Sequence, residues 1–327
     1  MIQLSDLRKY YPLQAGFFAR EEQKVYAVNG VSLRIEPGEI YGLVGESGCG
    51  KTTTARMLVR MERPTAGDIL FRSREGEEYH VGELDRQRLR ALRSRVRYIF
   101  QDPARSLNPR LSIREVLLSG YRYSPLWPGR EDAEAEARSL IQEVGLKISD
   151  LDRRPADFSG GQRQRISIAR ALITKPEVLI CDEVVSALDV SIQGQILNLL
   201  LRVREERGLT MIFIAHDLAV VGYVSDRIGV MYRGVLVEEA PARTLLARRL
   251  HPYTNYLFRA LPVLALDGVA STAGDAPGPA GAPAADAADG TPAFSRTADP
   301  TVDPVSDPRL LRMDEPEAGH RVSRMFR

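Results

Sequence analysis

The sequence predicts an α/β fold built around a mostly parallel β-sheet, and three observations support this. Short apolar runs, typical of strands covered on both faces, alternate along the chain with helical patterns. One of these runs, Ile40–Val44, is followed by a glycine-rich loop and then by a helix that begins near Lys51. The 327 residues are 44% hydrophobic and 27% charged, which suits a globular protein with a sizeable core. The apolar runs are Ile40–Val44, Val96–Phe100, Val178–Cys181 and Met211–Ala215, and the helical patterns include Glu131–Val144 and Gln164–Leu172.

An antiparallel β region is expected beside the parallel sheet. Tyr26–Ile35 is a mixed apolar strand that ends before the turn pair Pro37-Gly38. Later in the chain, Ile228–Tyr232 and Val235–Glu239 flank Arg233-Gly234, which is the pattern of a β-hairpin. We therefore expect residues 1–250 to form one domain with both parallel and antiparallel strands.

Residues 251–327 are expected to form a C-terminal extension. Ala, Gly and Pro make up 19 of the 30 residues from 271 to 300, and Phe294 is the only large apolar side chain there. Such a segment buries too little surface to offset its ordering entropy. The extension is therefore expected to be largely low-complexity and disordered between about 265 and 305.

Charge and cysteine content exclude several classes of protein. Lys and Arg (45) nearly balance Asp and Glu (43), so the net charge is only +2. This charge excludes the broad excess of positive charge that drives nucleic-acid binding. The arginines between 86 and 93 are expected to form a solvated helix face. No apolar run has the ~18–20 residues of a membrane span, and the N-terminus has no signal pattern. Cys49 and Cys181 are the only cysteines, which indicates structural thiols in a reducing, cytosolic compartment.

A phosphate-binding pattern, G-x-x-x-x-G-K-[ST], is matched by Gly45-Glu46-Ser47-Gly48-Cys49-Gly50-Lys51-Thr52-Thr53. Glycines let successive backbone N–H groups point inward at phosphate oxygens, and the following helix adds its positive end. Lys51 would bridge the β- and γ-phosphates, and the Thr52 hydroxyl would coordinate Mg²⁺. The alternative is a glycine-rich turn capped by Thr52, which the preceding strand, the spacing and the lysine together disfavour.

A pair of carboxylates, Asp182 and Glu183, ends the apolar strand Val178–Cys181. In a parallel sheet this end opens onto the ligand crevice. Asp182 would hold Mg²⁺ through its hydration shell, and Glu183 would orient and deprotonate the attacking water. By itself, the pair would be interpreted as a solvated acidic strand end, but the phosphate-binding pattern in the same chain favours a functional role for both carboxylates.

A third motif, Phe158-Ser159-Gly160-Gly161-Gln162, precedes the helical run Arg163–Leu172. Ser159 is a natural N-cap, and the two glycines expose backbone N–H groups that could meet a phosphate. By itself this is an ordinary loop-to-helix junction, and its place about 20 residues before the acidic pair makes it diagnostic.

These motifs, in this order, resemble the ATP-binding subunit of ABC transporters over residues 1 to about 262. The resemblance implies a RecA-like P-loop NTPase core with an inserted helical subdomain at about 102–157 that grips the membrane permease. It implies that Gln101 senses the metal, that Asp189 belongs to the D-loop Ser186-Ala187-Leu188-Asp189, and that His216 contacts the γ-phosphate. Tyr11 is placed against adenine, with Tyr10 as the competitor. Taken singly, Gln101 and Asp189 could be polar loop residues, His216 a hydrogen-bonded core histidine and Tyr11 a surface aromatic.

The segments Phe100–Arg110, Val185–Gln193 and His251-Pro252-Tyr253-Thr254 resemble the oligopeptide and dipeptide permease branch, whose members handle peptides, glutathione and nickel. We therefore expect a peptide substrate. Many members hold an iron–sulfur cluster through cysteines in the extension. Here Gly319–Ser323 resembles the closing motif with Ser323 in place of cysteine, so we expect no iron–sulfur cluster.

The resemblance also implies the partners. In the family, the signature residues Ser159, Gly160 and Gly161 complete the ATP site of an opposing subunit, so one chain with a single motif set must pair with a second ATPase. A heterodimer is favoured over a homodimer. Two transmembrane permease subunits and, indirectly, an extracytoplasmic solute-binding protein complete the expected complex, with this chain on the cytoplasmic face of the cell membrane and no nucleic acid.

Two other classes compete with a transporter ATPase. A soluble ABC ATPase acting on DNA would carry long coiled coils between its motifs, whereas only 131 positions separate Lys51 from Asp182 here, without sustained heptads. A ribosome-acting form would carry two motif sets. A non-hydrolysing regulatory subunit is disfavoured by the intact Lys51, Asp182, Glu183 and His216.

Overall fold

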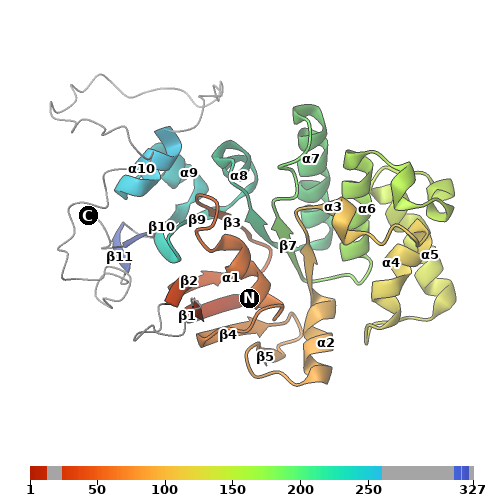
Figure 1. Ribbon diagram of the computed structural model, residues 1–327, viewed down its shortest axis with the longest axis horizontal. Helices are drawn as coiled ribbons and strands as arrows, with labels where there is room; N and C mark the ends of the chain where they lie inside the picture. The colour runs from red at the N-terminus through yellow and green to blue at the C-terminus, as the bar shows by residue number, and fades with distance from the viewer. Residues whose placement is uncertain (13–23, 260–312, 318, 324–327) are drawn as a thin grey trace, which may run out of the picture.

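The computed structural model describes residues 1–12, 24–259, 313–317 and 319–323. These residues form two β-sheets with helices around them, and a group of helices lies to one side (Figure 1). The expected low-complexity stretch lies outside the described residues. Within them, no helix combines the length and the apolar character needed to cross a membrane.

The larger sheet has eight strands in the order β11-β12-β10-β9-β3-β8-β7-β6. Its centre is parallel, with β9, β3, β8, β7 and β6 running side by side, as the apolar runs predict. Every residue of β3, β7 and β8 is buried, which explains why these strands are continuously apolar. The bounds are β3 (Ile40–Val44), β6 (Val96–Ile99), β7 (Val178–Asp182), β8 (Thr210–Ile214), β9 (Arg227–Tyr232), β10 (Val235–Pro241), β11 (Met313–Glu317) and β12 (His320–Ser323).

The smaller sheet is wholly antiparallel, in the order β2-β1-β4-β5, and contains the predicted strand Tyr26–Ile35 as part of β2. The predicted hairpin lies in the larger sheet, where β9 pairs with β10. A hydrophobic cluster joins the two sheets, with Leu4, Val31 and Ile69 from the small sheet and Ile180 and Ile214 from the large one. The bounds are β1 (Ile2–Pro12), β2 (Lys24–Ile35), β4 (Ala66–Arg72) and β5 (Glu78–His80).

The helical subdomain follows β6, and its buried residues, such as Leu117 and Leu140, belong to one hydrophobic cluster with the large sheet. Ser112 caps α4 in a capping box with Glu115, which satisfies backbone N–H groups at the helix start. The helices group on the right of Figure 1, beyond α7 (Val190–Arg207). Their bounds are α3 (Pro103–Ser106), α4 (Ile113–Arg122), α5 (Arg130–Glu143) and α6 (Gly160–Leu172).

The remaining helices are α1 (Lys51–Leu58), α2 (Arg86–Arg95), α8 (Leu218–Val224), α9 (Ala242–Ala247) and α10 (Pro252–Arg259). The arginines of α2 that are expected to form a solvated face, Arg86, Arg88, Arg90 and Arg93, are exposed. The guanidinium of Arg93 also donates to the carbonyls of Val59 and Arg60, which closes the segment after α1.

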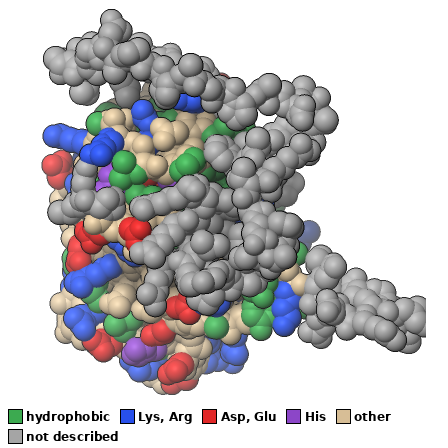
Figure 2. Space-filling view, turned by 90° about the vertical axis from the view of Figure 1, so that its left-hand side faces the viewer, with side chains coloured by type: hydrophobic (Ala, Val, Ile, Leu, Met, Phe, Trp, Pro, Cys, Tyr) green, Lys and Arg blue, Asp and Glu red, His purple; other side chains and the backbone are tan. Residues whose placement is uncertain are grey.

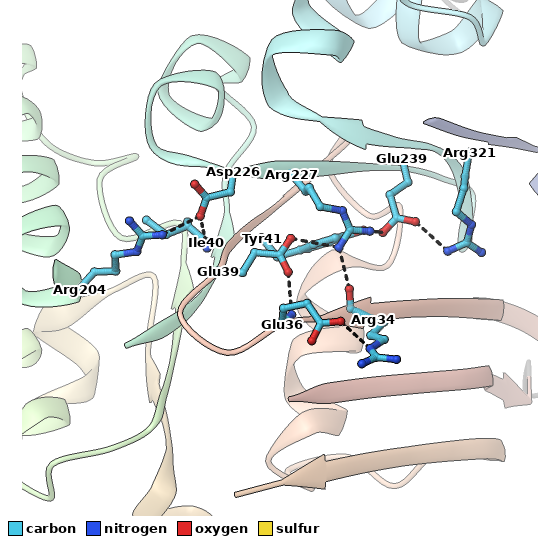
Figure 3. A network of polar contacts seen from close by, with 10 residues as sticks. All are labelled: Arg34, Glu36, Glu39, Ile40, Tyr41, Arg204, Asp226, Arg227, Glu239 and Arg321. Atoms are coloured by element: carbon cyan, nitrogen blue, oxygen red, sulfur yellow. Dashed lines mark hydrogen bonds and ion pairs between the residues drawn. The ribbon is translucent and has the colours of Figure 1, made fainter. Parts of the chain in front are cut away.

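The end of the chain returns to the large sheet, where β12 pairs with β10. Beside this junction, Glu239 of β10 is fully buried and accepts hydrogen bonds from Tyr41, Arg227 and Arg321 (Figure 3). On the described part of the face in Figure 2, acidic and basic side chains are intermixed. That pattern fits the near-neutral charge of the sequence.

Candidate nucleotide site

The Gly45–Thr53 loop connects β3 to α1, as predicted, and its glycines are required by its shape. Gly45, Gly48 and Gly50 have φ angles of 149°, 79° and 109°, in the region that side chains disfavour. A Cβ atom on Gly45 would lie 2.2 Å from the carbonyl oxygen of Met231, and one on Gly50 would lie 2.2 Å from that of Ala27. The backbone can follow this path only with glycine at both positions.

Lys51 lies inside this loop and is 5% exposed. Its ammonium group donates to the carbonyl oxygens of Gly45, at 2.6 Å, and Glu46, at 2.8 Å. The cation thus closes the loop from within and stands where an anion held by the loop would meet it.

The hydroxyl of Thr52 and the carboxylate of Asp182 meet at the start of α1. Thr52 Oγ1 donates to Asp182 Oδ1 at 3.1 Å, and the Tyr98 hydroxyl donates to the other carboxylate oxygen at 2.5 Å. Hydroxyl and carboxylate oxygens are hard donors of the kind that Mg²⁺ prefers, and Mg²⁺ commonly takes its other ligands from water and substrate phosphates. The two residues therefore fit the predicted magnesium site.

Glu183 lies where Gln101 and His216 converge. Gln101 Nε2 donates to Glu183 Oε2 at 2.5 Å, and His216 Nδ1 lies 3.9 Å from Glu183 Oε1. Glu183 has a φ of +50°, which is uncommon for a residue with a side chain and typical of functional sites. The His216 side chain is 60% exposed, so it is not a core histidine.

The register of the parallel strands explains this convergence. Asp182 at the end of β7 is level with Ile214 at the end of β8, and Leu43 of β3 is level with the same residue. The carboxyl ends of three strands thus meet at one edge of the sheet. Gln101, Glu183 and the Gly45–Thr53 loop are brought together there although they are far apart in sequence.

Three comparisons with known proteins bear on this site. The model of the ABC transporter family matches residues 28–186. Oligopeptide transport ATP-binding protein AppF of Bacillus subtilis (strain 168) is 45% identical over 264 residues, 80% of this chain and 78% of AppF. OppF of the same organism, also an oligopeptide transport ATP-binding protein, is 47% identical over 246 residues, 75% of this chain and 79% of OppF.

The chain belongs to the ABC transporter ATP-binding proteins. Glutathione import ATP-binding protein GsiA of Escherichia coli (strain K12) is 44% identical over 80% of this chain and 41% of GsiA. Among solved structures, the dimeric ATP-binding cassette MJ0796 in a post-hydrolysis state with ADP and Pi aligns with a TM-score of 0.64 and 27% identity, over 74% of this chain and 99% of that one. The chain is therefore an ATPase of the ABC type, and a soluble ATPase acting on DNA or the ribosome is not favoured.

The signature residues lie apart from this edge. Ser159 caps α6 by accepting from the Gln162 N–H, while the Gln162 side chain accepts from the Ser159 N–H at 3.0 Å. Within the described part of the chain, these hydrogen bonds join the two residues to each other and stay within that turn. Ser159 and Gly160 are exposed, and Figure 1 shows α6 on the far side of α7 from α1. The structure does not bring Ser159–Gln162 to the Gly45–Thr53 loop.

Asp189 is also exposed, and its side chain makes no cap bond although it occupies the N-cap position of α7. The next residue, Val190, is an apolar side chain that is 85% exposed. A Cβ atom on Gly161 would lie 2.7 Å from Ile192 Cγ2, so the signature turn and the start of α7 are in close contact. Together they form one exposed surface that carries both the signature and the D-loop residues.

Tyr11 stays a prediction. Its side chain is 40% exposed, its hydroxyl donates to Glu62, and Lys9 lies over its ring. Burial, followed by the bond to Glu62, raises the pKa of Tyr11 to about 12. Its competitor Tyr10 packs against Tyr26, with ring centroids 5.8 Å apart.

Two residues at the site were not predicted. Tyr98 bonds Asp182 from β6, and Arg56 lines a pocket with Gln101 and Asp182. A usable signal exists for Arg56, because it follows Thr52 by four positions and therefore shares its helix face.

Proposed function

We propose that this chain is the ATP-hydrolysing subunit of an importer for di- or oligopeptides. The observation that carries the proposal is the meeting of Lys51, Thr52, Asp182, Glu183 and Gln101 at one end of a parallel sheet. AppF and OppF are named for oligopeptide transport and GsiA for glutathione import, so a peptide-like solute is the substrate class that the relatives support.

Binding of ATP is assigned to the Gly45–Thr53 loop. Its backbone N–H groups and the start of α1 supply positive potential for phosphate oxygens. Lys51 would exchange its bonds to the carbonyls of Gly45 and Glu46 for bonds to phosphate. The buried ammonium already stands inside the loop, so little rearrangement is required.

Thr52 and Asp182 would hold the magnesium ion, with Gln101 nearby. When bound, Mg²⁺ neutralises charge that develops on the phosphates. The 3.1 Å bond between Thr52 and Asp182 keeps their oxygens adjacent and ready for this role.

Glu183 is assigned the general base, because its carboxylate lies next to the proposed magnesium ligand Asp182 and is held by Gln101. His216, exposed at the other side of Glu183, would contact the γ-phosphate. Hydrolysis also requires charge stabilisation from the far side of the phosphate, which Ser159 and the N–H groups of Gly160 and Gly161 would provide to a second subunit.

This separation of the two half-sites supports a two-chain site, with a heterodimer as the favoured form. The exposed Val190 beside Asp189 supports an interface at that surface. A groove in the helical subdomain, lined among others by Leu118, Tyr123 and Trp127, is assigned to the permease, whose membrane position would place this chain on the cytoplasmic face. A solute-binding protein would act through the permease.

The Glu183→Gln variant tests the enzymatic part of this proposal. Loss of the base should lower the turnover of MgATP about 100- to 10,000-fold while ATP binding is retained. Glu205→Gln, which neutralises an exposed carboxylate on α7, is the matched control and should leave turnover unchanged. Turnover of Glu183→Gln within twofold of the wild-type rate would remove Glu183 from the role of base.

A further inference from the structure

The C-terminal extension contacts the Gly45–Thr53 loop through Tyr253 of α10. The backbone N–H of Glu46 donates to the Tyr253 hydroxyl at 3.1 Å, across 207 positions of sequence. Tyr253 is 3% exposed, and its bond to Glu46 is partly buried. None of the assigned roles of the nucleotide site uses this residue.

Lys51 holds the same peptide group. The Glu46 N–H and the Gly45 carbonyl belong to one peptide unit, and that carbonyl accepts from Lys51 Nζ at 2.6 Å. The carbonyl of the next peptide unit, that of Glu46, accepts from Lys51 Nζ at 2.8 Å and from the Cys49 N–H at 3.3 Å. When phosphate draws Lys51 away, the bond to Tyr253 remains to hold the Gly45–Glu46 peptide.

Tyr253 is itself fixed by its surroundings. Its ring stacks on Tyr232 of β9, with centroids 4.2 Å apart and planes at 35°. Glu238 of β10, fully buried, accepts from the N–H groups of Leu250 at 2.8 Å and His251 at 3.1 Å, just before α10. His320 Nε2 of β12 lies 2.7 Å from the same carboxylate, which links the C-terminal strand to this arrangement.

We infer that Tyr253 is a positioning residue for ATP, because its hydroxyl holds the Gly45–Glu46 peptide in the conformation that binds phosphate. A loop that is ordered before binding loses less conformational entropy when the ligand arrives. The extension thereby sets nucleotide affinity, while Glu183 and Asp182 carry out the chemistry. This inference rests on the proposed role of the Gly45–Thr53 loop and gives Tyr253 a role at the nucleotide site that the resemblance does not assign to it.

The test compares Tyr253→Phe, which removes the hydroxyl and keeps the ring, with Tyr256→Phe on the same helix. Titration calorimetry with MgATP on full-length chains in the Glu183→Gln background gives Kd. We expect Tyr253→Phe to raise Kd about 2- to 10-fold, from the loss of one hydrogen bond. With Glu183 intact, KM for ATP should rise in parallel, and kcat at saturating ATP should stay within twofold. Tyr256→Phe should match the wild-type chain.

Three results would overturn the inference: an unchanged Kd for Tyr253→Phe, an equal rise in Kd for Tyr256→Phe, or a fall in kcat with constant KM. Tyr253→Leu removes ring and hydroxyl together, and it should raise Kd beyond the value for Tyr253→Phe. Failure of the proposed function is distinguishable, because the wild-type chain itself would then bind no MgATP.

Discussion

Replacing Glu239 by alanine should be among the most destabilising single changes in this protein. The carboxylate is fully buried and accepts from Tyr41 at 2.9 Å, Arg227 at 2.7 Å and Arg321 at 2.8 Å. These donors lie on β3, β9 and β12, so one side chain connects the centre of the large sheet to the C-terminal strand (Figure 3). In Glu239→Ala the Tyr41 hydroxyl loses the carboxylate to which it donates, and Arg227 keeps Glu39 at 3.1 Å as its nearest carboxylate.

The magnitude follows from what is left unpaired. Breaking a buried ion pair by removing one partner costs about 3–5 kcal/mol. The Arg227 side chain is 29% exposed and keeps Glu39, so the lower limit of about 3 kcal/mol applies. With an unfolding entropy of about 2.1 cal/mol/K per residue, Tm of a chain of 327 residues shifts by about 1.5 °C per kcal/mol, so Tm should fall by about 4–5 °C.

Thermal unfolding followed by circular dichroism measures this shift in the full-length chain. Arg321→Met is the matched control, because it removes one donor that is 30% exposed and keeps the aliphatic stem. It should lower Tm by about 1.5 °C, from the loss of about 1 kcal/mol. A Glu239→Ala variant within 2 °C of the wild-type chain would show that the buried carboxylate does not connect these strands.

Two further predictions concern the nucleotide site. Thr52→Val keeps the side-chain shape but removes the hydroxyl bonded to Asp182. The Mg²⁺ concentration at half-maximal hydrolysis should therefore rise about 10- to 100-fold. An unchanged Mg²⁺ dependence would contradict the role of Thr52 as a metal ligand. Burial raises the pKa of both Cys49 and Cys181, which leaves less thiolate at a given pH. At pH 8 the native chain should therefore react far more slowly with Ellman's reagent than the chain unfolded in guanidinium. In the unfolded chain two thiols should react. Equal rates in the two conditions would show that the thiols are accessible.

The parallel strands and the hairpin could be predicted from sequence because their signals are local. The predicted strand Val178–Cys181 differs from β7 by one residue. It could be recognised because a short β-branched run can be buried on both faces only as a central strand. The helix predicted over Gln164–Leu172 begins earlier, at Gly160. Its first turn contains two glycines, which have low helix propensity, so propensity alone does not predict this turn. The Ser159 cap is the local signal that marks the start of the helix.

The pairing of the C-terminal strand β12 with β10 could not be predicted. Glu238 and Glu239 end the predicted hairpin strand as two charged residues, yet both are fully buried. Their partners His320 and Arg321 lie 82 positions away, beyond a segment of low complexity. No local pattern indicates that such distant residues pair. From the sequence alone, the two buried glutamates therefore resemble the exposed end of a strand.

The candidate site was predictable as a set of motifs, and its geometry was not. The loop, Asp182, Glu183, Gln101 and His216 were placed on the right elements, because strand carboxyl ends meet at one edge of a parallel sheet. Tyr98 and Tyr253 were missed as parts of it, since each contacts the site through tertiary packing. Tyr98 sits beside β7 only because Tyr98 and Ile180 share a register position.

The molar mass of the Glu183→Gln chain in solution tests the two-chain nucleotide site most directly. The chain of 36.4 kDa is mixed with a candidate second ATPase subunit and analysed by gel filtration with light scattering, with and without MgATP. We predict a species with the summed mass of two chains that forms only with ATP, because each nucleotide needs Ser159 and Gly160 from the opposite chain. A Glu183→Gln chain that stays monomeric with every partner, while the isolated wild-type chain hydrolyses ATP at its full rate, would contradict the account.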